Sequence, residues 1–201
     1  MRLLADPRSS ASLRVLCYLD HKQREIEIVP LSLRAGEHRS EAYAALNPSL
    51  AVPALDLGPQ GVVGQSLAIM EYLESLWPEA PLLPSGELGR AQVRNLCGLV
   101  AADIHPLANM RVREEIARLA GPQAATQWSQ RWTHTGLQMV EGWLARHGGR
   151  FAVGDTLTLA DFFVAPLVFN ALRLGCDPRP FERLQALYQR CQALPAFQRL
   201  A

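Results

Sequence analysis

Hydrophobic and polar positions follow two different rhythms along the chain. Over the first 77 residues, strand-like stretches in which apolar and polar residues alternate are separated by stretches with the helical spacing of apolar residues. The predicted strands span residues 2–5, 25–30, 52–57 and 62–63, and the predicted helices span 10–21, 40–46 and 66–77. Ser66 is expected to cap the last of these helices. The order βαβαββα is typical of a sheet with helices packed on it, and it predicts an α/β domain.

Strand patterns disappear in the second part of the chain. Four long helical periods follow one another there, at about 88–108, 123–147, 159–174 and 181–191. Between the two parts lies the stretch "PEAPLLPSG", which is rich in proline and reads as a linker. We therefore predict two domains, an α/β domain at residues 1–78 and an all-helical domain at 87–201, joined by a linker at 79–86.

The clearest local signal in the helical part is Thr158-Leu-Ala-Asp161. This spacing is typical of a capping box, in which the Thr158 hydroxyl and the Asp161 carboxylate satisfy main-chain amides at the start of a helix. We therefore interpret Asp161 as a structural residue.

Composition limits the classes of function. Hydrophobic residues make up 49% of the 201 residues and charged residues 19%, which favours a folded globular chain over a disordered one. Twenty basic residues against nineteen acidic ones leave a net charge of +1, without the one-signed excess that binds nucleic acid. Lys22 is the only lysine, so the chain is rich in arginine, and most single arginines are expected to be solvated surface charges.

The start of the chain does not resemble a secretory signal, because Asp6 and Arg8 stand where its apolar run would be. The most apolar later stretch, 162–172, is interrupted by Pro166 and Asn170 and is shorter than the roughly 20 residues needed to span a bilayer. We therefore expect a cytoplasmic protein without a membrane segment.

The four cysteines are scattered along the chain. They form no Cys-x-x-Cys pair, and no histidine stands near them at the spacing of a metal site. We interpret Cys17, Cys97, Cys176 and Cys191 as reduced core residues and predict no metal centre.

Several motifs in a fixed order resemble a known family. A serine stands at the first strand-helix turn, followed by "NPSLAVPAL" at 47–55, "GQSLAIMEYLE" at 64–74 and "GDTLTLADFFVAP" at 154–166. Over nearly its whole length the chain resembles the glutathione transferases. Within them it resembles the zeta class, the maleylacetoacetate isomerases, and "DIHPLANMR" at 103–111 is similar to the glutathione-dependent maleylpyruvate isomerases of bacteria. The resemblance implies a thioredoxin-like domain that binds glutathione, a helical domain with the second-substrate pocket, and a homodimer.

A transferase must favour the thiolate of glutathione, since a thiol with a pKa of about 8.5 is only about 3% ionised at pH 7. A hydroxyl donor at a helix N-terminus, together with the helix dipole, provides this stabilisation. Ser9 and Ser10 stand at such a point, although a serine before a helix more often only caps it. The family pattern assigns the thiolate to Ser9 and leaves Ser10 as the cap or a second donor.

Two further segments are candidates for the glutathione site. By itself the sequence favours a trans proline at Val52-Pro53, on an edge strand. The resemblance implies a cis proline instead, with the Val52 main chain pairing with glutathione as with an extended peptide. Gln65-Ser66 opens a helix, where amides and the Ser66 hydroxyl suit the γ-glutamyl carboxylate, or form a plain cap.

The helical domain contributes candidates through the resemblance alone. Similarity to the maleylpyruvate isomerases implies that Asp103 reaches the γ-glutamyl amine of glutathione in the partner subunit and that His105 contacts the cofactor. An exposed helical aspartate and a helix-end histidine before Pro106 are the plainer interpretations.

The proposed substrates, maleylacetoacetate or maleylpyruvate, are dianionic, so their pocket requires an arginine that grips a carboxylate. Arg8, Arg111 and Arg173 stand at positions that line this pocket in the resembling isomerases, and Asn109 adds a polar contact. Addition of the glutathione thiolate to the double bond, rotation and elimination then give the trans isomer, with glutathione as a cofactor.

Three residues depart from the zeta pattern. Ala11 replaces the active-site cysteine, and Cys17 cannot substitute for it, because six residues place it about 120° around the helix. Leu50 and Ala51 replace polar residues, which predicts weaker glutathione binding. Two alternatives therefore stay open: a general transferase or peroxidase acting on electrophiles or hydroperoxides, and a non-catalytic binding module.

Overall fold

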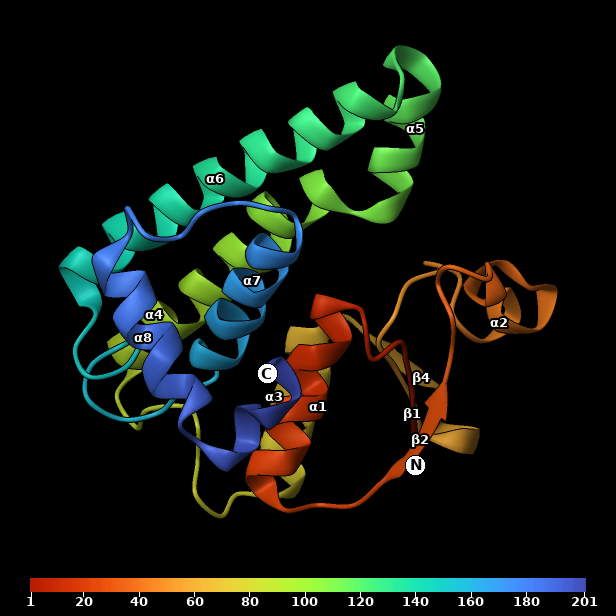
Figure 1. Ribbon diagram of the computed structural model, residues 1–201. Helices are drawn as coiled ribbons and strands as arrows, with labels where there is room; N and C mark the ends of the chain where they lie inside the picture. Colours follow the sequence, from red (N-terminus) through yellow and green to blue (C-terminus); the bar gives the residue numbers. More distant parts are fainter. The chain divides into compact units, whose positions relative to one another are not determined.

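The computed structural model describes all residues from Met1 to Ala201 (Figure 1). The chain forms two compact units, Met1–Pro81 and Leu82–Ala201. The boundary between them lies inside the proline-rich stretch.

The first unit contains a four-stranded mixed sheet in the order β2-β1-β3-β4. Strand β1 runs parallel to β2 and antiparallel to β3, and β3 runs antiparallel to β4. The βαβαββα order predicted from the sequence is confirmed. Its elements are β1 (Arg2–Ala5), α1 (Ser10–Lys22), β2 (Glu27–Pro30), α2 (Glu41–Leu46), β3 (Ala54–Asp56), β4 (Val62–Gly64) and α3 (Ser66–Leu76), with 3-10 turns at Glu37–Arg39 and Gly58–Gln60.

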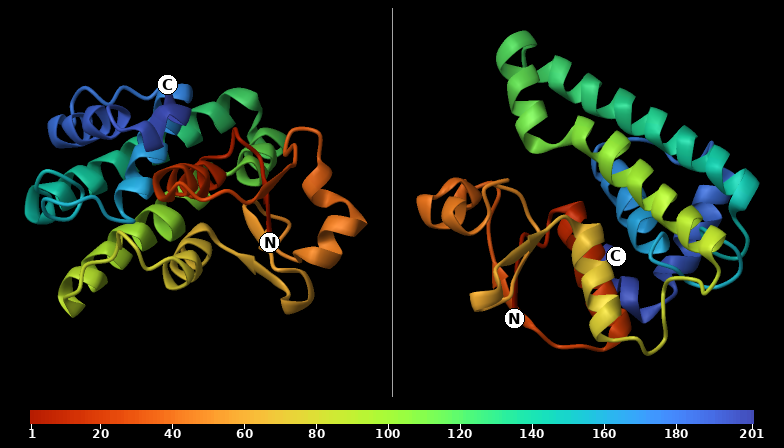
Figure 2. Two further views of the ribbon diagram at one scale, coloured as in Figure 1. Left: turned by 90° about the horizontal axis from the view of Figure 1, so that it is seen from below. Right: turned by 180° about the vertical axis from the view of Figure 1, so that it is seen from behind.

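The two faces of the sheet are covered by different helices. Leu3 pairs with Leu55, and both side chains are fully buried. On the opposite face, because side chains alternate along a strand, Leu4 and Ala54 join a cluster with Tyr43 of α2. Helices α1 and α3 contact each other and lie side by side (Figures 1 and 2). Helix α3 also contacts strands β3 and β4.

The second unit contains only helices, as predicted, but the helix expected at 88–108 is not continuous. Helix α4 gives way to a π-helical turn and then to a 3-10 turn at Pro106, which has no N–H to continue an α-helix. Gly136 lies against the π turn, where an added Cβ would come within 2.4 Å of the Ile104 side chain. Close packing therefore accompanies the change of helix type.

A helix that the sequence analysis missed follows this turn. Helix α5 carries apolar residues at helical spacing, Val112, Ile116 and Leu119, although none of its residues is buried, and it packs beside the long helix α6 (Figure 1). The elements of the second unit are α4 (Glu87–Gly98), the π turn Leu99–Ile104, the 3-10 turn His105–Ala108, α5 (Met110–Ala120), α6 (Pro122–His147), α7 (Asp161–Arg173), α8 (Glu182–Gln192) and the 3-10 turn Pro195–Leu200.

Asp161 is the first residue of α7 and is completely buried. Its carboxylate accepts hydrogen bonds from the N–H groups of Ala152 and Thr158, each at 2.8 Å, and from the Thr158 hydroxyl at 3.1 Å. The structural role of Asp161 is confirmed. The predicted role of the Thr158 hydroxyl was wrong, since it donates to the carboxylate. Burial raises the pKa of Asp161 to about 6, against the effect of these hydrogen bonds.

All four cysteines are buried and none forms a disulfide, as expected for core thiols. No group of histidine, cysteine and acidic side chains is arranged to hold a metal ion. None of the helices combines the length and the apolar character that crossing a membrane requires.

Candidate glutathione site

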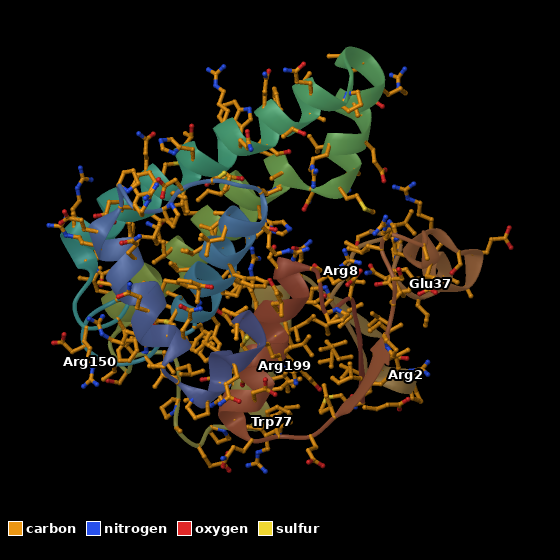
Figure 3. All side chains as sticks on the ribbon, viewed as in Figure 1. Arg2, Arg8, Glu37, Trp77, Arg150 and Arg199 are labelled. Carbon is orange, nitrogen blue, oxygen red and sulfur yellow. The ribbon has the colours of Figure 1, made fainter.

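The turn between β1 and α1 is held by the buried side chain of Asp6. One carboxylate oxygen accepts from the N–H of Arg8 at 2.8 Å, and the other accepts from the N–H of Leu33 at 2.9 Å. The Asp6 carbonyl also accepts from the N–H of Ser9 at 2.9 Å. Three hydrogen bonds thus fix the chain as it enters α1. Arg8 is exposed beside this entrance (Figure 3).

Ser9 is the N-cap residue of α1, with extended backbone, and its Oγ accepts from the N–H of Ser12 at 3.4 Å. Of the two alternatives for Ser10, the cap was therefore wrong, since Ser10 is the first helical residue and is buried; the role of second donor stays a prediction. The Ser9 oxygen accepts from the helix, and the hydroxyl keeps one proton that it can donate. The half-buried Ser9 hydroxyl thus combines a donor with the positive end of the α1 dipole.

The loop before β3 presents a main-chain segment. The Val52–Pro53 peptide bond is cis, as the resemblance implied and contrary to the trans form favoured by the sequence alone. The Ala51 carbonyl, directly before it, accepts from the Tyr43 hydroxyl at 2.6 Å and from the Asn47 side-chain amide at 2.8 Å. The N–H and C=O of Val52 take part in none of the main-chain hydrogen bonds outside the helices and strands.

The start of α3 lies beside this loop, because Gly64 at the end of β4 pairs with Ala54 at the start of β3. Gln65 has a φ of 65° and a ψ of 117°, an unfavourable conformation for a residue with a side chain. Gln65 is the N-cap position, so the expectation that Ser66 caps this helix was wrong. Ser66 is the first helical residue, and only 5% of it is exposed.

Arg14 connects the two helix starts. It lies on α1, is only 2% exposed, and donates from Nη1 to the Ser66 Oγ at 3.1 Å. Sequence reasoning missed this residue, because arginine is abundant and most arginines were expected to be solvated. The signal that identifies it is its place between Leu13 and Val15 in the most apolar part of α1. A charge at such a position must have a partner inside the protein.

The first unit therefore brings together the Ser9 turn, the Val52-Pro53 segment and the Gln65-Ser66 helix start. Two of the departures from the zeta pattern lie on the same loop: Leu50, with a φ of 52°, and Ala51 are both exposed. Ala11 is partly exposed one residue after the start of α1. The site offers main-chain and hydroxyl donors, and Ala11 brings no thiol to it.

In the second unit, four of the predicted residues lie on one continuous stretch. Asp103 is exposed on the π turn, His105 is partly exposed on the 3-10 turn, Asn109 is the N-cap residue of α5, and Arg111 is exposed on α5. Arg173 is the exposed last residue of α7, with its guanidinium 5.7 Å from the centre of the Phe169 ring. The roles of these residues stay predictions.

Comparison with known proteins identifies the family. Residues 8–76 match the Glutathione S-transferase N-terminal domain, and residues 103–195 match the Glutathione S-transferase C-terminal domain. A maleylpyruvate isomerase from Ralstonia is 38% identical, over 100% of this chain and 96% of that protein. A zeta-class glutathione S-transferase from Euphorbia esula is 36% identical, over 98% of this chain and 88% of that protein.

This chain belongs to the zeta class of the glutathione transferase family. Solved structures agree. A bacterial zeta-class maleylpyruvate isomerase superposes on this zeta-class chain with a TM-score of 0.93 at 38% identity, covering 100% of this chain and 96% of that one. A maleylacetoacetate isomerase from Methylobacterium extorquens, solved with glutathione and malonate, gives 0.94 at 33% identity, covering 100% and 95%. The thioredoxin-like domain and all-helical domain predicted from the sequence form the fold of this family.

Proposed function

We propose that this zeta-class chain is a glutathione-dependent isomerase that converts maleylacetoacetate or maleylpyruvate into the trans isomer. The observation that carries the proposal is the set of three donor segments in the first unit, in a chain similar over its full length to proteins named as these isomerases. Glutathione binding is assigned to the domain at residues 1–78, and Asn109, Arg111 and Arg173 of the domain at 87–201 bind the second substrate.

The residues of the first unit fit glutathione, which is an extended tripeptide with a carboxylate at each end. The Val52 main-chain groups are available to pair with the backbone of an extended peptide. The amides at the start of α3 and the Ser66 hydroxyl suit the γ-glutamyl carboxylate, since the first amides of a helix have no partner within it. Ser9 donates to the sulfur. Neighbouring structures of maleylacetoacetate isomerases were solved with glutathione bound.

When bound, glutathione supplies a thiolate that adds reversibly to the cis double bond, so that the bond can rotate before the sulfur leaves. The protein's task is to keep this sulfur ionised. Each unit by which the thiol pKa falls requires about 1.4 kcal/mol of preferential interaction with the anion. The Ser9 hydroxyl and the α1 dipole supply that interaction, and Ala11 leaves glutathione as the only source of sulfur at this turn.

The second substrate carries two carboxylates, and arginine is suited to bind them in a bidentate way. Arg8, Arg111 and Arg173 are exposed and have the required chemistry. Asp103 and His105 are assigned to glutathione, Asp103 to that of the partner subunit in a homodimer. A cytoplasmic location is also proposed, because four cysteines without a disulfide are typical of a reducing compartment.

The test uses the purified full chain with maleylacetone and with maleylpyruvate, and follows the absorbance of each with and without glutathione. We expect a change that requires both the protein and glutathione. Arg173→Ala should lose this activity and retain glutathione binding. No change with either substrate, together with faster turnover of an aryl halide or cumene hydroperoxide, would overturn the isomerase in favour of a general transferase.

A further inference from the structure

We propose that Arg14 is a positioning residue of the glutathione site, which orients the Ser66 hydroxyl so that its proton points at the γ-glutamyl carboxylate. This inference rests on the proposed function, because it assumes that glutathione binds at the start of α3. Arg14 has no part in the thiolate chemistry described above, so this role is a separate one.

The geometry links one charge to one hydroxyl. Arg14 lies one helical turn after the start of α1, and its Nη1 is 3.1 Å from the Ser66 Oγ on α3. Arg14 is 2% exposed and Ser66 is 5% exposed, so water does not compete strongly for this bond. A hydrogen bond from an ionised donor is about twice as strong as one between neutral groups.

The direction of this hydrogen bond decides what Ser66 can do. A guanidinium only donates, whereas a serine hydroxyl has one proton to donate and two lone pairs that accept. Arg14 therefore occupies a lone pair of Ser66 Oγ and leaves its proton for another acceptor. A carboxylate at the start of α3 is such an acceptor, and the neighbouring helix amides favour it as well.

The charge contributes in a second way. Arginine keeps its positive charge at every pH at which a protein is folded, and burial reduces the screening of that charge by water. A carboxylate that accepts from the Ser66 hydroxyl would be separated from the Arg14 guanidinium only by the Ser66 oxygen. The predicted ligand at this position is therefore an anion, and a neutral group of the same size should bind less well.

A purely structural role predicts a different result. In that case Arg14 only joins α1 to α3, and its loss weakens every ligand alike or lowers stability. The same two helices are joined elsewhere by the hydrogen bond from the Tyr18 hydroxyl to the Glu74 carboxylate at 3.0 Å. Tyr18→Phe removes that second link without touching the glutathione site, so it provides a matched control.

The experiment measures the Kd of two ligands by titration calorimetry. One ligand is glutathione, and the other is 4-aminobutyryl-cysteinylglycine, which retains the amine and lacks only the γ-glutamyl carboxylate. We expect the wild type to bind glutathione with a Kd about 10- to 100-fold lower than that of the analogue. This ratio corresponds to the free energy of one hydrogen bond to a charged group. Arg14→Met should reduce this preference at least about fivefold, as should Ser66→Ala, and the double variant should lose little more.

Tyr18→Phe should retain the wild-type preference even if its unfolding temperature falls. Arg14→Lys, which keeps a charged donor, should retain part of the preference and serves if Arg14→Met does not fold. An unchanged preference in a folded Arg14 variant would overturn the positioning role. Equal binding of both ligands by the wild type would overturn the anion site while glutathione binding stands, and no binding of glutathione at all would refute the proposed function itself.

Discussion

Helices α1 and α3 are joined by buried polar contacts toward both ends, and the two ends differ in how completely those contacts are satisfied. Toward the C-terminal end, Glu74 pairs with Lys22 at 2.6 Å and accepts from the Tyr18 hydroxyl at 3.0 Å. Lys22 also donates to the carbonyls of Trp77, Glu79 and Ala80. Every group named here has its partner inside the first unit. Figure 3 marks this end by Trp77 and the opposite end by Arg8.

Toward the N-terminal end, the arrangement leaves donors for a ligand. Arg14 donates to the Ser66 Oγ, so the Ser66 hydroxyl keeps its own proton to donate. The first N–H groups of α3 have no acceptor within the helix. Ser9 likewise accepts from the helix and retains its own proton. Two sets of contacts between the same helices thus have different roles: the closed network around Glu74 stabilises the fold, and the open one around Ser66 suits ligand binding.

The largest effect on stability is expected at the closed end, which is the C-terminal end of α1 and α3 with Tyr18, Lys22 and Glu74. Glu74→Ala leaves the buried Lys22 and Tyr18 without their shared partner, and removing one member of a buried ion pair costs about 3 to 5 kcal/mol. Urea unfolding measures the loss. Glu79→Ala, which removes only an exposed pair with Arg24, is the control and should cost less than about 1 kcal/mol. Similar losses for the two variants would contradict the distinction between the ends.

A second closed network, around Asp161 in the helical unit, should show a smaller and pH-dependent effect. Asp161→Asn disturbs three hydrogen bonds to a buried carboxylate and should cost about 2 kcal/mol at pH 7. Because burial raises the folded pKa of Asp161 to about 6, the folded state binds a proton more readily than the unfolded chain.

The sign of the pH effect follows from this difference. Between about pH 4 and pH 6, the Asp161 contribution to stability falls as the pH rises, by up to about 3 kcal/mol, and it is constant above that range. The gap between wild type and Asp161→Asn should therefore widen on acidification from pH 7 to pH 4.5. A gap that stays constant or narrows over this range would exclude the raised pKa.

Substitutions at the open end, the N-terminal end of α1 and α3 with Ser9, Arg14 and Ser66, should affect chemistry more than stability. Ser9→Ala removes the proposed donor to the sulfur, so the pKa of bound glutathione should rise by about one unit and turnover at pH 7 should fall about tenfold. The ultraviolet absorbance of the thiolate, titrated against pH, measures the first effect. The lost helix cap should cost only about 1 kcal/mol. A pKa unchanged in a variant that still binds glutathione would remove Ser9 from the thiolate site.

The order of the strands and helices could be predicted because each element repeats its apolar residues at a regular spacing. Helix α5 was not predicted, although Val112, Ile116 and Leu119 stand at the same helical spacing. The break after α4 depends on Pro106 and on the close approach of Gly136 to Ile104. Tertiary packing decides such details, and a local pattern does not contain them.

The same limit applies to the site. Ser9, Val52-Pro53 and Gln65-Ser66 stand at turns that short motifs identify, so their places in the fold could be predicted, while their binding roles stay predictions. The cap positions at both helices were misassigned by one residue, because the start of a helix depends on main-chain conformation, and at Gln65 that conformation follows from the end of β4 at Gly64. Arg14 was missed because its importance comes from α3, which is 52 positions away in sequence.

Lys22 gives the closed end a further property. It is the only lysine in the sequence, and its side chain is 3% exposed. A reagent that acylates amines can reach this side chain only when the ends of α1 and α3 separate. The extent of Lys22 acylation over time, read by mass spectrometry of the peptide that contains it, therefore reports how often this end of the molecule opens while the chain as a whole stays folded.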